Sequence, residues 1–408
     1  MLSATWDLYK NAYTGLSKRT WYLSLVMLVN RSGTMVVAFL TVYCNTKLHF
    51  TIQQSGFIVA LFGAGAVVGA LLGGKIIDDW GFYPLQVASL ILGGIFFIVV
   101  GYLKTFETLS IGIFVLSVCN ESFRPANSTA IAYYSAIENR TRSFSLNRLA
   151  INLGWAFGSA LGGFLATFNY RLLFWVDGST NILSAILLLK LLPFVKSGSR
   201  SRGPEKKVPV KGPYQDKKYL AFICLVILYG ACFFELFTMI SLYFKTQWQF
   251  NEMLIGSLMA INGLLIVCFE MILIYSIEGT RPHTYFISLG VFIVGSAFAL
   301  LNFVPHIYIA AAACVVLITI GEIMSMPFLN SFWISRTHED NRGRYAAMYT
   351  IAWSIAQIAA PTFGSLLITQ KGFPFLLGTL FFICFAAAIG FNLLGKISRD
   401  RLPWRKLF

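Results

Sequence analysis

Apolar stretches of roughly twenty residues, each long enough to cross the hydrocarbon core of a membrane as a helix, recur along this whole sequence. Hydrophobic residues make up 57% of the chain and charged residues only 12%. Such a composition lies outside the range of soluble globular proteins. We count twelve stretches, at residues 20–44, 54–77, 83–103, 108–135, 146–168, 172–194, 218–244, 252–276, 284–304, 306–330, 343–369 and 373–396. The sequence therefore predicts an all-α integral membrane protein with twelve transmembrane helices.

Residues that bind metals or form disulfides are few and scattered. The seven cysteines lie within or at the ends of apolar stretches without paired spacing, and the four histidines fall at the edges of loops. We therefore expect free thiols, no bound metal and no cofactor. The sequence also contains no Walker loop, metal cluster or nucleophile elbow, so it does not predict an enzyme.

The net charge of +15 is carried mainly by the loops. Basic residues are concentrated at 196–217, between the sixth and seventh stretches, and again from Lys396 onward. Because basic loops of membrane proteins remain in the cytoplasm, both termini and the linker 196–217 are predicted to be cytoplasmic, in a bacterial inner membrane. Here the basic residues favour anionic lipid headgroups as partners and not nucleic acid. We expect a monomer.

The linker separates residues 1–195 from 218–408, and these two parts carry a weak internal repeat. At an offset of 202 the matched pairs are Pro125 with Pro327, Asn139 with Asn341, Arg140 with Arg342 and Arg142 with Arg344. At an offset of 200 they are Gly56 with Gly256, Gly63 with Gly263 and Asp78 with Glu278. This pattern predicts two pseudo-symmetric six-helix halves with a binding site between them, near the middle of the membrane.

The sequence "GGKIIDDWGFYP" after the second stretch resembles the G-x-x-x-D-x-x-G signature of the major facilitator superfamily. Gly74, Asp78 and Gly81 match the signature. Residues of other types stand where arginine or lysine is typical: Asp79, Phe82 and Tyr83. The resemblance implies a major facilitator fold that alternates access to a central cavity, lined by the first, fourth, seventh and tenth helices. It also implies that the matched residues control the conformational change.

In the fifth stretch, "GWAFGSALGG" is similar to the G-x-x-x-G-P-x-x-G-G motif of antiporters in the same superfamily. Gly154, Gly158, Gly162 and Gly163 match it, and Ser159 replaces its proline. The resemblance implies proton antiport and assigns the glycines to the conformational change. Glycines four residues apart also let two helices approach closely, so helix packing explains the same stripe equally well.

A second resemblance leads to a different substrate. "FRPANSTAIAYY" and the following "INLG" are similar to the F-K-P-N and I-N-x-G stretches of proton-coupled oligopeptide transporters. The first stretch reads "LVNRSGTM", which keeps the arginine of the E-x-x-E-R motif of those transporters, here Arg31, and neither glutamate. The resemblance implies a symporter for a small peptide-like or carboxylate-bearing nutrient.

Ionisable residues inside the apolar stretches are functional candidates, because each costs about 2.5 to 3.5 kcal/mol to insert near the membrane centre. They are Arg31, Glu121, Arg124, Asp177, Glu235, Glu270 and Glu322. Glu235 and Glu322 have no basic neighbour within a helical turn, so we predict that they carry protons, with Glu121 as a further candidate. Glu270 lies closer to a helix end and is expected to reach toward the membrane surface.

Glu121 and Arg124 are three residues apart and can pair on one helical face. A purely structural salt bridge is one interpretation. The other is that the pair faces the cavity close to Arg31 and leaves one guanidinium free for substrate. The predicted substrate-binding residues are Arg31, Arg124, Asn30, Asn127, Tyr229, Phe233 and Trp353.

These patterns favour a proton antiporter that exports amphipathic or cationic small organic molecules. The main alternative is a proton symporter importing a small anionic or zwitterionic nutrient, because Arg31 and Arg124 could bind a carboxylate. A receptor-like or lipid-handling protein without proton coupling remains a third possibility.

Overall fold

The computed structural model describes residues 10–195, 212–250, 252–304, 308–338 and 340–398. Most of the predicted linker, 196–211, lies outside the described residues. The first half of the chain forms α2 (Lys18–Ser32), α3 (Val36–Thr46), α4 (Ile52–Trp80), α5 (Phe82–Val100), α6 (Phe106–Glu121), α7 (Phe123–Tyr134), α8 (Arg140–Phe168) and α9 (Arg171–Leu191). The second half forms α10 (Lys217–Phe234), α11 (Ser241–Thr246), α12 (Glu252–Ile277), α13 (His283–Phe303), α14 (Tyr308–Ser335) and α15 (Arg342–Ser398).

Ten of these helical segments are long and apolar enough to cross a membrane. The last of them, α15, is two helical legs separated at Gly372, whose φ of 80° lies in the left-handed region that favours glycine. Near the start of α10, the Tyr219 hydroxyl and the Lys218 ammonium bond the carbonyls of Tyr345 and Ile397, one in each leg. The chain therefore reverses at Gly372. The two legs of α15 count as two crossings, and α2 and α3 together count as one broken span, so the arrangement is consistent with twelve crossings. The predicted all-α membrane fold is confirmed.

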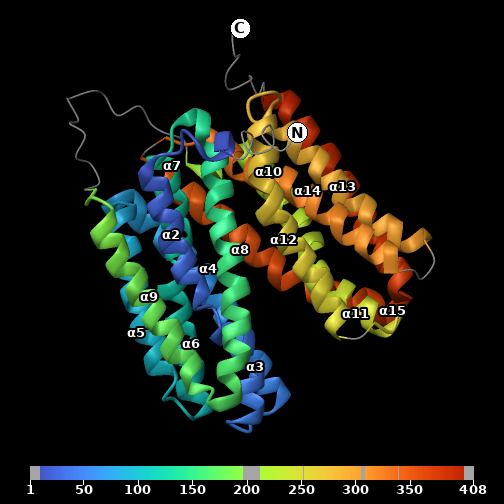
Figure 1. Cartoon of the computed structure of the whole chain (residues 1–408). Helices are drawn as coiled ribbons and strands as arrows, with labels where there is room; N and C mark the ends of the chain where they lie inside the picture. Colours follow the sequence, from blue (N-terminus) through green and yellow to red (C-terminus); the bar gives the residue numbers. More distant parts are fainter. Residues whose placement is uncertain (1–9, 196–211, 251, 305–307, 339, 399–408) are drawn as a thin grey trace, which may run out of the picture.

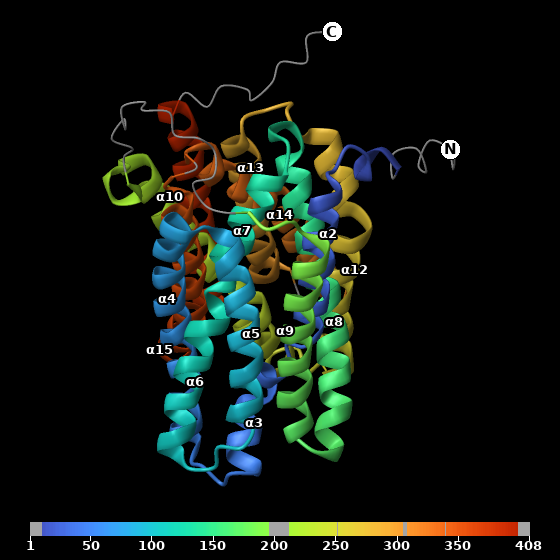
Figure 2. The same ribbon diagram turned by 90° about the vertical axis from the view of Figure 1, so that its left-hand side faces the viewer.

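The helices form two bundles, which Figure 1 shows in blue to green (α2 to α9) and in yellow to red (α10 to α15). We call them the N-terminal and the C-terminal bundle. They meet along two seams: α4 packs against α15, and α8 packs against α12. Figure 2 shows these pairs on opposite sides of the molecule. This is the pseudo-symmetric arrangement that the repeat predicted.

The first predicted span is broken between α2 and α3, and Asp177 of α9 occupies the break. Its carboxylate accepts hydrogen bonds from the backbone N–H groups of Met35, at 3.1 Å, and Val36, at 2.8 Å. A carboxylate at a helix N-terminus satisfies free N–H groups and interacts favourably with the helix dipole. Asp177 therefore has a structural role in fixing the start of α3.

The glycine stripe of α8 faces α2 and the break that follows it. A Cβ added at Gly154 would lie 2.6 Å from the Cβ of Arg31, and one at Gly158 would lie 3.0 Å from the carbonyl oxygen of Ser32. At Gly162 the nearest atom is the Cβ of Met35, at 3.1 Å. Close packing of α8 on the first span therefore accounts for the stripe, and its role in the transport cycle stays a prediction.

Candidate functional site

Three buried charges meet where the bundles touch along α8. The Arg148 guanidinium donates to the Glu270 carboxylate of α12 at 2.7 Å and to the Glu322 carboxylate of α14. Both carboxylates are almost completely shielded from solvent. Because Arg148 belongs to the N-terminal bundle and both carboxylates to the C-terminal bundle, a single side chain joins the two. We call Arg148, Glu270 and Glu322 the charge triad.

Polar neighbours hold the triad on its C-terminal side. The Asn262 amide donates to Glu322 at 3.0 Å and to the Thr319 hydroxyl at 2.9 Å. The second oxygen of Glu270 is buried and has no hydrogen-bond partner within the described part of the chain. One guanidinium and two carboxylates leave a formal surplus of one negative charge. Such a surplus in a buried site favours a bound proton or cation.

The triad corrects two expectations from the sequence. Glu270 does not reach toward the surface: it is fully buried and paired with Arg148. Glu322 is not without a basic partner, because Arg148 reaches it from 174 residues away in sequence. Arg148 itself was missed because it lies near the edge of an apolar stretch. The predicted stretch begins at residue 146, whereas α8 begins at Arg140, so Arg148 is two turns inside the helix. Extending the predicted helix toward its N-terminus would have included Arg148 among the buried candidates.

A second charged group lies within the N-terminal bundle. Arg124 and Glu121 form an ion pair at 3.2 Å, and Glu121 also accepts from the Asn120 amide at 3.0 Å. Arg31 of α2 is close enough for both of these charges to act on it. The side chain of Arg124 remains 37% exposed. Arg31 thus lies near this ion pair, and the three residues carry a formal surplus of one positive charge.

The amides of Asn30 and Asn127 make hydrogen bonds inside the N-terminal bundle. Asn30 donates to the Asn181 amide oxygen of α9 at 2.9 Å, and Asn127 donates to the Asn147 amide oxygen of α8 at 3.2 Å. Both side chains are buried. The structure therefore places them at helix contacts within the bundle, and their assignment to substrate stays a prediction.

Glu235 lies apart from the triad, at the end of α10 and immediately before a π-helical turn, η3 (Leu236–Ile240). It is buried, and one of its oxygens accepts from the Thr238 hydroxyl at 3.1 Å. The other oxygen has no hydrogen-bond partner among the described residues and points at Gly364 of α15, where an added Cβ would lie 2.5 Å away. Interruptions of this kind within a helix often mark functional positions.

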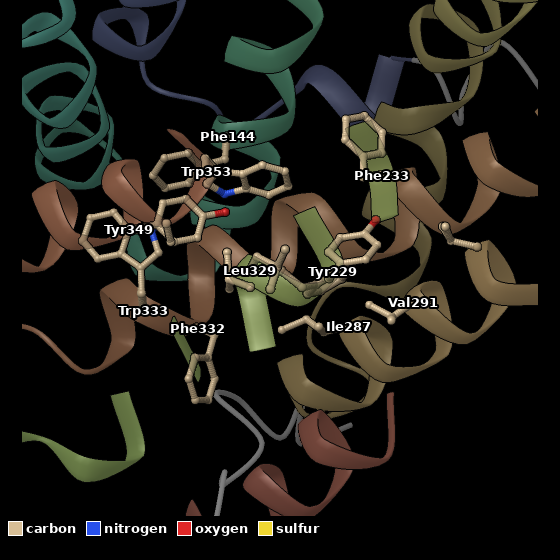
Figure 3. Close-up of a cluster of buried hydrophobic side chains, with 14 of the residues drawn as sticks. Phe144, Tyr229, Phe233, Ile287, Val291, Leu329, Phe332, Trp333, Tyr349 and Trp353 are labelled. Atoms are coloured by element: carbon tan, nitrogen blue, oxygen red, sulfur yellow. The ribbon is translucent and has the colours of Figure 1, made fainter. Parts of the chain in front are cut away.

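Aromatic side chains of the C-terminal bundle fill the space beside these charges. Figure 3 shows Tyr229, Phe233, Tyr349 and Trp353, with Phe144 of α8 against Trp353. The Trp353 ring centroid lies 6.4 Å from that of Tyr229 and 6.2 Å from that of Phe233, both edge to face. The Tyr229 hydroxyl bonds the Ser325 hydroxyl at 2.6 Å. These aromatic side chains form one buried cluster, which in this conformation is packed and closed.

The cluster lies near both charged groups. Tyr349 is close enough for the charges of Arg124 and Arg148 to act on it, and Tyr229 is similarly close to Arg148 and Glu322. Aromatic faces next to both a positive and a negative surplus are able to accept an amphipathic organic ion.

Two matching contacts close the end of the molecule at which α2 begins and α15 ends, which we call the latch end. At the α4–α15 seam, Asp78 accepts a hydrogen bond from the Gly343 N–H at 2.9 Å and forms an ion pair with the Arg344 guanidinium, also at 2.9 Å. At the α8–α12 seam, Glu278 accepts from the Thr141 N–H and from the Arg142 guanidinium, both at 3.1 Å. We call these contacts the Asp78 latch and the Glu278 latch.

The latches explain the signature after the second stretch. Asp79, Phe82 and Tyr83 stand where the signature usually has basic residues, and the cationic partner of Asp78 comes instead from the other bundle. Gly74 lets α15 approach, because an added Cβ would lie 3.0 Å from the carbonyl oxygen of Gly343. Gly81, with φ of 95°, separates α4 from α5.

Residues 23–361 match the family described as the Major Facilitator Superfamily. The chain belongs to the major facilitator superfamily. Membership identifies it as an integral membrane transporter, and its substrate as a small molecule.

Curated members of the superfamily resemble the chain at low identity. Multidrug resistance protein 1 of Bacillus subtilis (strain 168) is 23% identical, over 82% of this chain and 86% of that protein. Tetracycline resistance protein, class H, of Pasteurella multocida is 22% identical, over 75% and 77%. Quinolone resistance protein NorA of Staphylococcus aureus (strain MRSA252) is 26% identical, over 53% and 55%.

Two solved structures share the fold. The human organic anion transporter MFSD10 (TETRAN) superposes with a TM-score of 0.74 at 13% identity, covering 91% of this chain and 98% of that one. A bacterial homologue of the iron transporter ferroportin, in an outward-facing state, gives a TM-score of 0.71 at 15% identity, covering 93% and 100%. At these identities the comparison concerns the fold alone.

Proposed function

We propose that this major facilitator exports amphipathic or cationic small organic molecules by proton antiport. The observation that carries the proposal is the charge triad, a buried site with a surplus negative charge that bridges the bundles. The names of the curated relatives, which are multidrug, tetracycline and quinolone resistance proteins, support the same substrate class.

Exchange follows from the charge balance of the triad. One proton on either carboxylate, or one cationic substrate beside them, neutralises the surplus charge. Binding both at once would leave a surplus positive charge, so proton and cation oppose each other's binding, and this opposition is reciprocal. In the proposed cycle a proton entering from one side displaces a cation that entered from the other.

The triad also links protonation to movement. Arg148 holds the bundles together most strongly while Glu270 and Glu322 are both ionised, since a neutral carboxyl binds a guanidinium less strongly. Proton uptake therefore weakens the contact across the α8–α12 seam and favours separation of the bundles. Separation at the latch end also requires the Asp78 and Glu278 latches to break. We assign Gly74, Asp78 and Gly81, with the α8 glycines, to this step.

For substrate recognition we propose the aromatic cluster of Tyr229, Phe233 and Trp353, together with Arg31 and Arg124. Asn30 and Asn127 are left out because their amides already bond within one bundle. Glu235 remains a second proposed proton carrier, with Glu121 paired to Arg124. The two parts that move are residues 1–195 and 218–408, with the latch end and both termini in the cytoplasm.

A second function, proton symport of a small anionic or zwitterionic nutrient, is favoured by one observation. Arg31, Glu121 and Arg124 leave a surplus positive charge, and Arg124 is partly exposed. A carboxylate would neutralise that surplus just as a cation would neutralise the triad.

Everted membrane vesicles with an acid interior distinguish the two functions. Addition of a lipophilic cation should release protons, measured as loss of quenching of a pH-sensitive dye, and the variant Glu322→Gln should abolish the release. The opposite outcome has two parts: proteoliposomes without an acidic interior take up a carboxylate-bearing compound together with protons, and cations cause no proton release. That outcome would show that the symport function is correct and the antiport function is not.

A further inference from the structure

Residues 10–16, which precede α2, lie across the α8–α12 seam at the latch end. Ala12 packs against Leu146 of α8 and Met271 of α12, and these three side chains form a small buried cluster of their own. Partly buried side chains packed on this cluster are Tyr13, Leu16 and Tyr275. The segment therefore contacts both bundles at once. We call residues 10–16 the brace.

Arg142 connects the brace to the Glu278 latch. One terminal nitrogen of its guanidinium donates to the carbonyl oxygens of Asn11, Ala12 and Thr14, at 3.3, 3.4 and 3.1 Å. Its Nε donates to Glu278 of α12 at 3.1 Å, and the guanidinium lies 5.2 Å from the ring centroid of Tyr275. Carbonyl groups at the end of a helical turn bind a cation favourably. The brace thus supplies the acceptors for one terminal nitrogen of Arg142, and the other terminal nitrogen donates to the Asn139 amide oxygen.

The other end of the brace is hydrogen-bonded to the N-terminal bundle. The Gly15 carbonyl accepts from the Asn139 amide at 2.8 Å. Next in sequence, the Ser17 hydroxyl donates to the Tyr134 carbonyl at 2.8 Å and its oxygen caps the start of α2. If the bundles separated at the latch end, the brace would move with α8, and its contacts with Met271 and Tyr275 of α12 would be lost.

The brace makes the two latches unequal. The Arg142 side chain is 11% exposed, whereas its repeat counterpart Arg344 in the Asp78 latch is 52% exposed. An ion pair shielded from water is screened less by salt and holds its partners more strongly than an exposed pair. The difference comes from the brace, because it lies over Arg142 and supplies three of its acceptors.

We propose that the brace selectively stabilises the form of the transporter that is closed at the latch end and so limits how readily this end opens. A contact made in only one of two states shifts the equilibrium by its whole differential free energy. This inference rests on the proposed alternating-access function but does not depend on which substrate or ion is transported.

The test measures the opening directly. Spin labels at Ile137→Cys and Ser276→Cys, both exposed and on different bundles, report the separation at the latch end by double electron–electron resonance. The accessible cysteines Cys119, Cys224 and Cys268 are replaced by alanine, since the other four are buried. Ala12→Lys places a charged chain inside the buried cluster and should raise the ratio of open to closed form by roughly fivefold or more. Asn11→Lys is the matched control, because that side chain is exposed.

Removal of the first sixteen residues gives a second variant, which keeps the Ser17 cap and should shift the ratio in the same direction. The inference is overturned if Ala12→Lys and the shortened chain retain the parent distance distribution, or if Asn11→Lys shifts it equally. Cation-driven proton release in vesicles is measured separately. A shifted distance distribution without any proton release would support the brace and contradict the antiport proposal.

Discussion

At the scale of single residues, Arg148 holds two carboxylates while each carboxylate depends on it for charge compensation. Removing the guanidinium leaves two buried carboxylates facing each other, whereas neutralising one carboxylate leaves a balanced pair. Loss of one partner of a buried ion pair is strongly destabilising because the remaining charge stays desolvated. Arg148 is therefore the member of the triad on which the fold depends most.

We predict that Arg148→Ala lowers the free energy of unfolding by about 3 to 5 kcal/mol, and that Glu270→Gln lowers it much less. Chemical denaturation of the detergent-purified protein gives both values. Arg281→Ala is the control, because that arginine is exposed and should change stability little. Equal losses for Arg148→Ala and Arg281→Ala would contradict the bridging role of the triad.

The surplus charge predicts how substrate binding depends on pH. In the parent protein the dissociation constant of a lipophilic cation should rise about tenfold per pH unit of acidification over the range where one proton competes. Glu322→Gln leaves the triad neutral, so this dependence should disappear. Fluorescence titrations across a pH series measure it. If Glu235→Gln removes the dependence and Glu322→Gln does not, Glu235 is the proton carrier.

Sequence reasoning singled out Glu322 and Glu235 because isolated carboxylates in apolar stretches are conspicuous, and it grouped Arg31 with Glu121 and Arg124, a grouping that stays a prediction. It failed at Arg148. An arginine near the edge of a stretch normally extends its charge to the membrane surface, and only the packing of α8 on α12 and α14 places it between two carboxylates. Contacts between residues more than a hundred positions apart leave no local pattern to read.

At the scale of helices, the close packing of α8 against the first span depends on glycines, which have no side chain. The two residues at the ends of the glycine motif differ in what surrounds them. An added Cβ at Gly154 would clash with backbone and side-chain atoms of Arg31, whereas at Gly163 the nearest atom, in Phe39, is 4.0 Å away. Gly163 can therefore serve as the control for a substitution at Gly154.

We predict that Gly154→Ala destabilises the protein by about 1 to 3 kcal/mol, because the overpacked helices must move apart. Gly163→Ala should be tolerated. Thermal unfolding in detergent tests both variants. Loss of transport in Gly163→Ala with unchanged stability would show that the motif has a role beyond packing, as the antiporter resemblance implies.

The sequence predicted the close helix approach at this motif but not which helix approaches. Glycines four residues apart indicate a smooth helix face, but they do not indicate which helix packs against it. The break between α2 and α3 was also unpredicted, because its cause is Asp177, more than 140 residues away, whose carboxylate caps α3.

At the scale of the whole molecule, the repeat relates the two latches but does not reveal how they pair. Asp78 corresponds to Glu278 and Arg142 to Arg344, yet each carboxylate binds the arginine of the opposite bundle. Both pairs consequently join the bundles at the same end. The internal repeat identifies which residues of the two halves are equivalent. Which carboxylate binds which arginine is seen only in the structure, where the two bundles face each other.

The Glu278 latch makes closure at this end depend on pH. Burial raises the pKa of Glu278 above its ordinary value of 4.5, and its hydrogen bond with Thr141 and the charge of Arg142 only partly oppose this effect. In the open form the carboxyl meets water and its pKa returns toward that value. The closed form therefore binds the proton more tightly, and the contribution of Glu278 to closure is full below pH 4.5 and declines as pH rises through the raised pKa.

We predict that Glu278 contributes a decrease in the closed fraction, followed with spin labels at Ile137→Cys and Ser276→Cys, as pH rises from 4.5 toward neutrality. This contribution opposes the strengthening of the triad as its carboxylates lose protons. Glu278→Gln should remove it, because glutamine mimics the protonated carboxyl and retains an acceptor for the Thr141 N–H. The Asp78 latch is unaltered in that variant and continues to hold the bundles together at this end. A profile that Glu278→Gln leaves unchanged, or a closed fraction that falls more steeply with pH in Glu278→Gln than in the parent, would contradict the assignment.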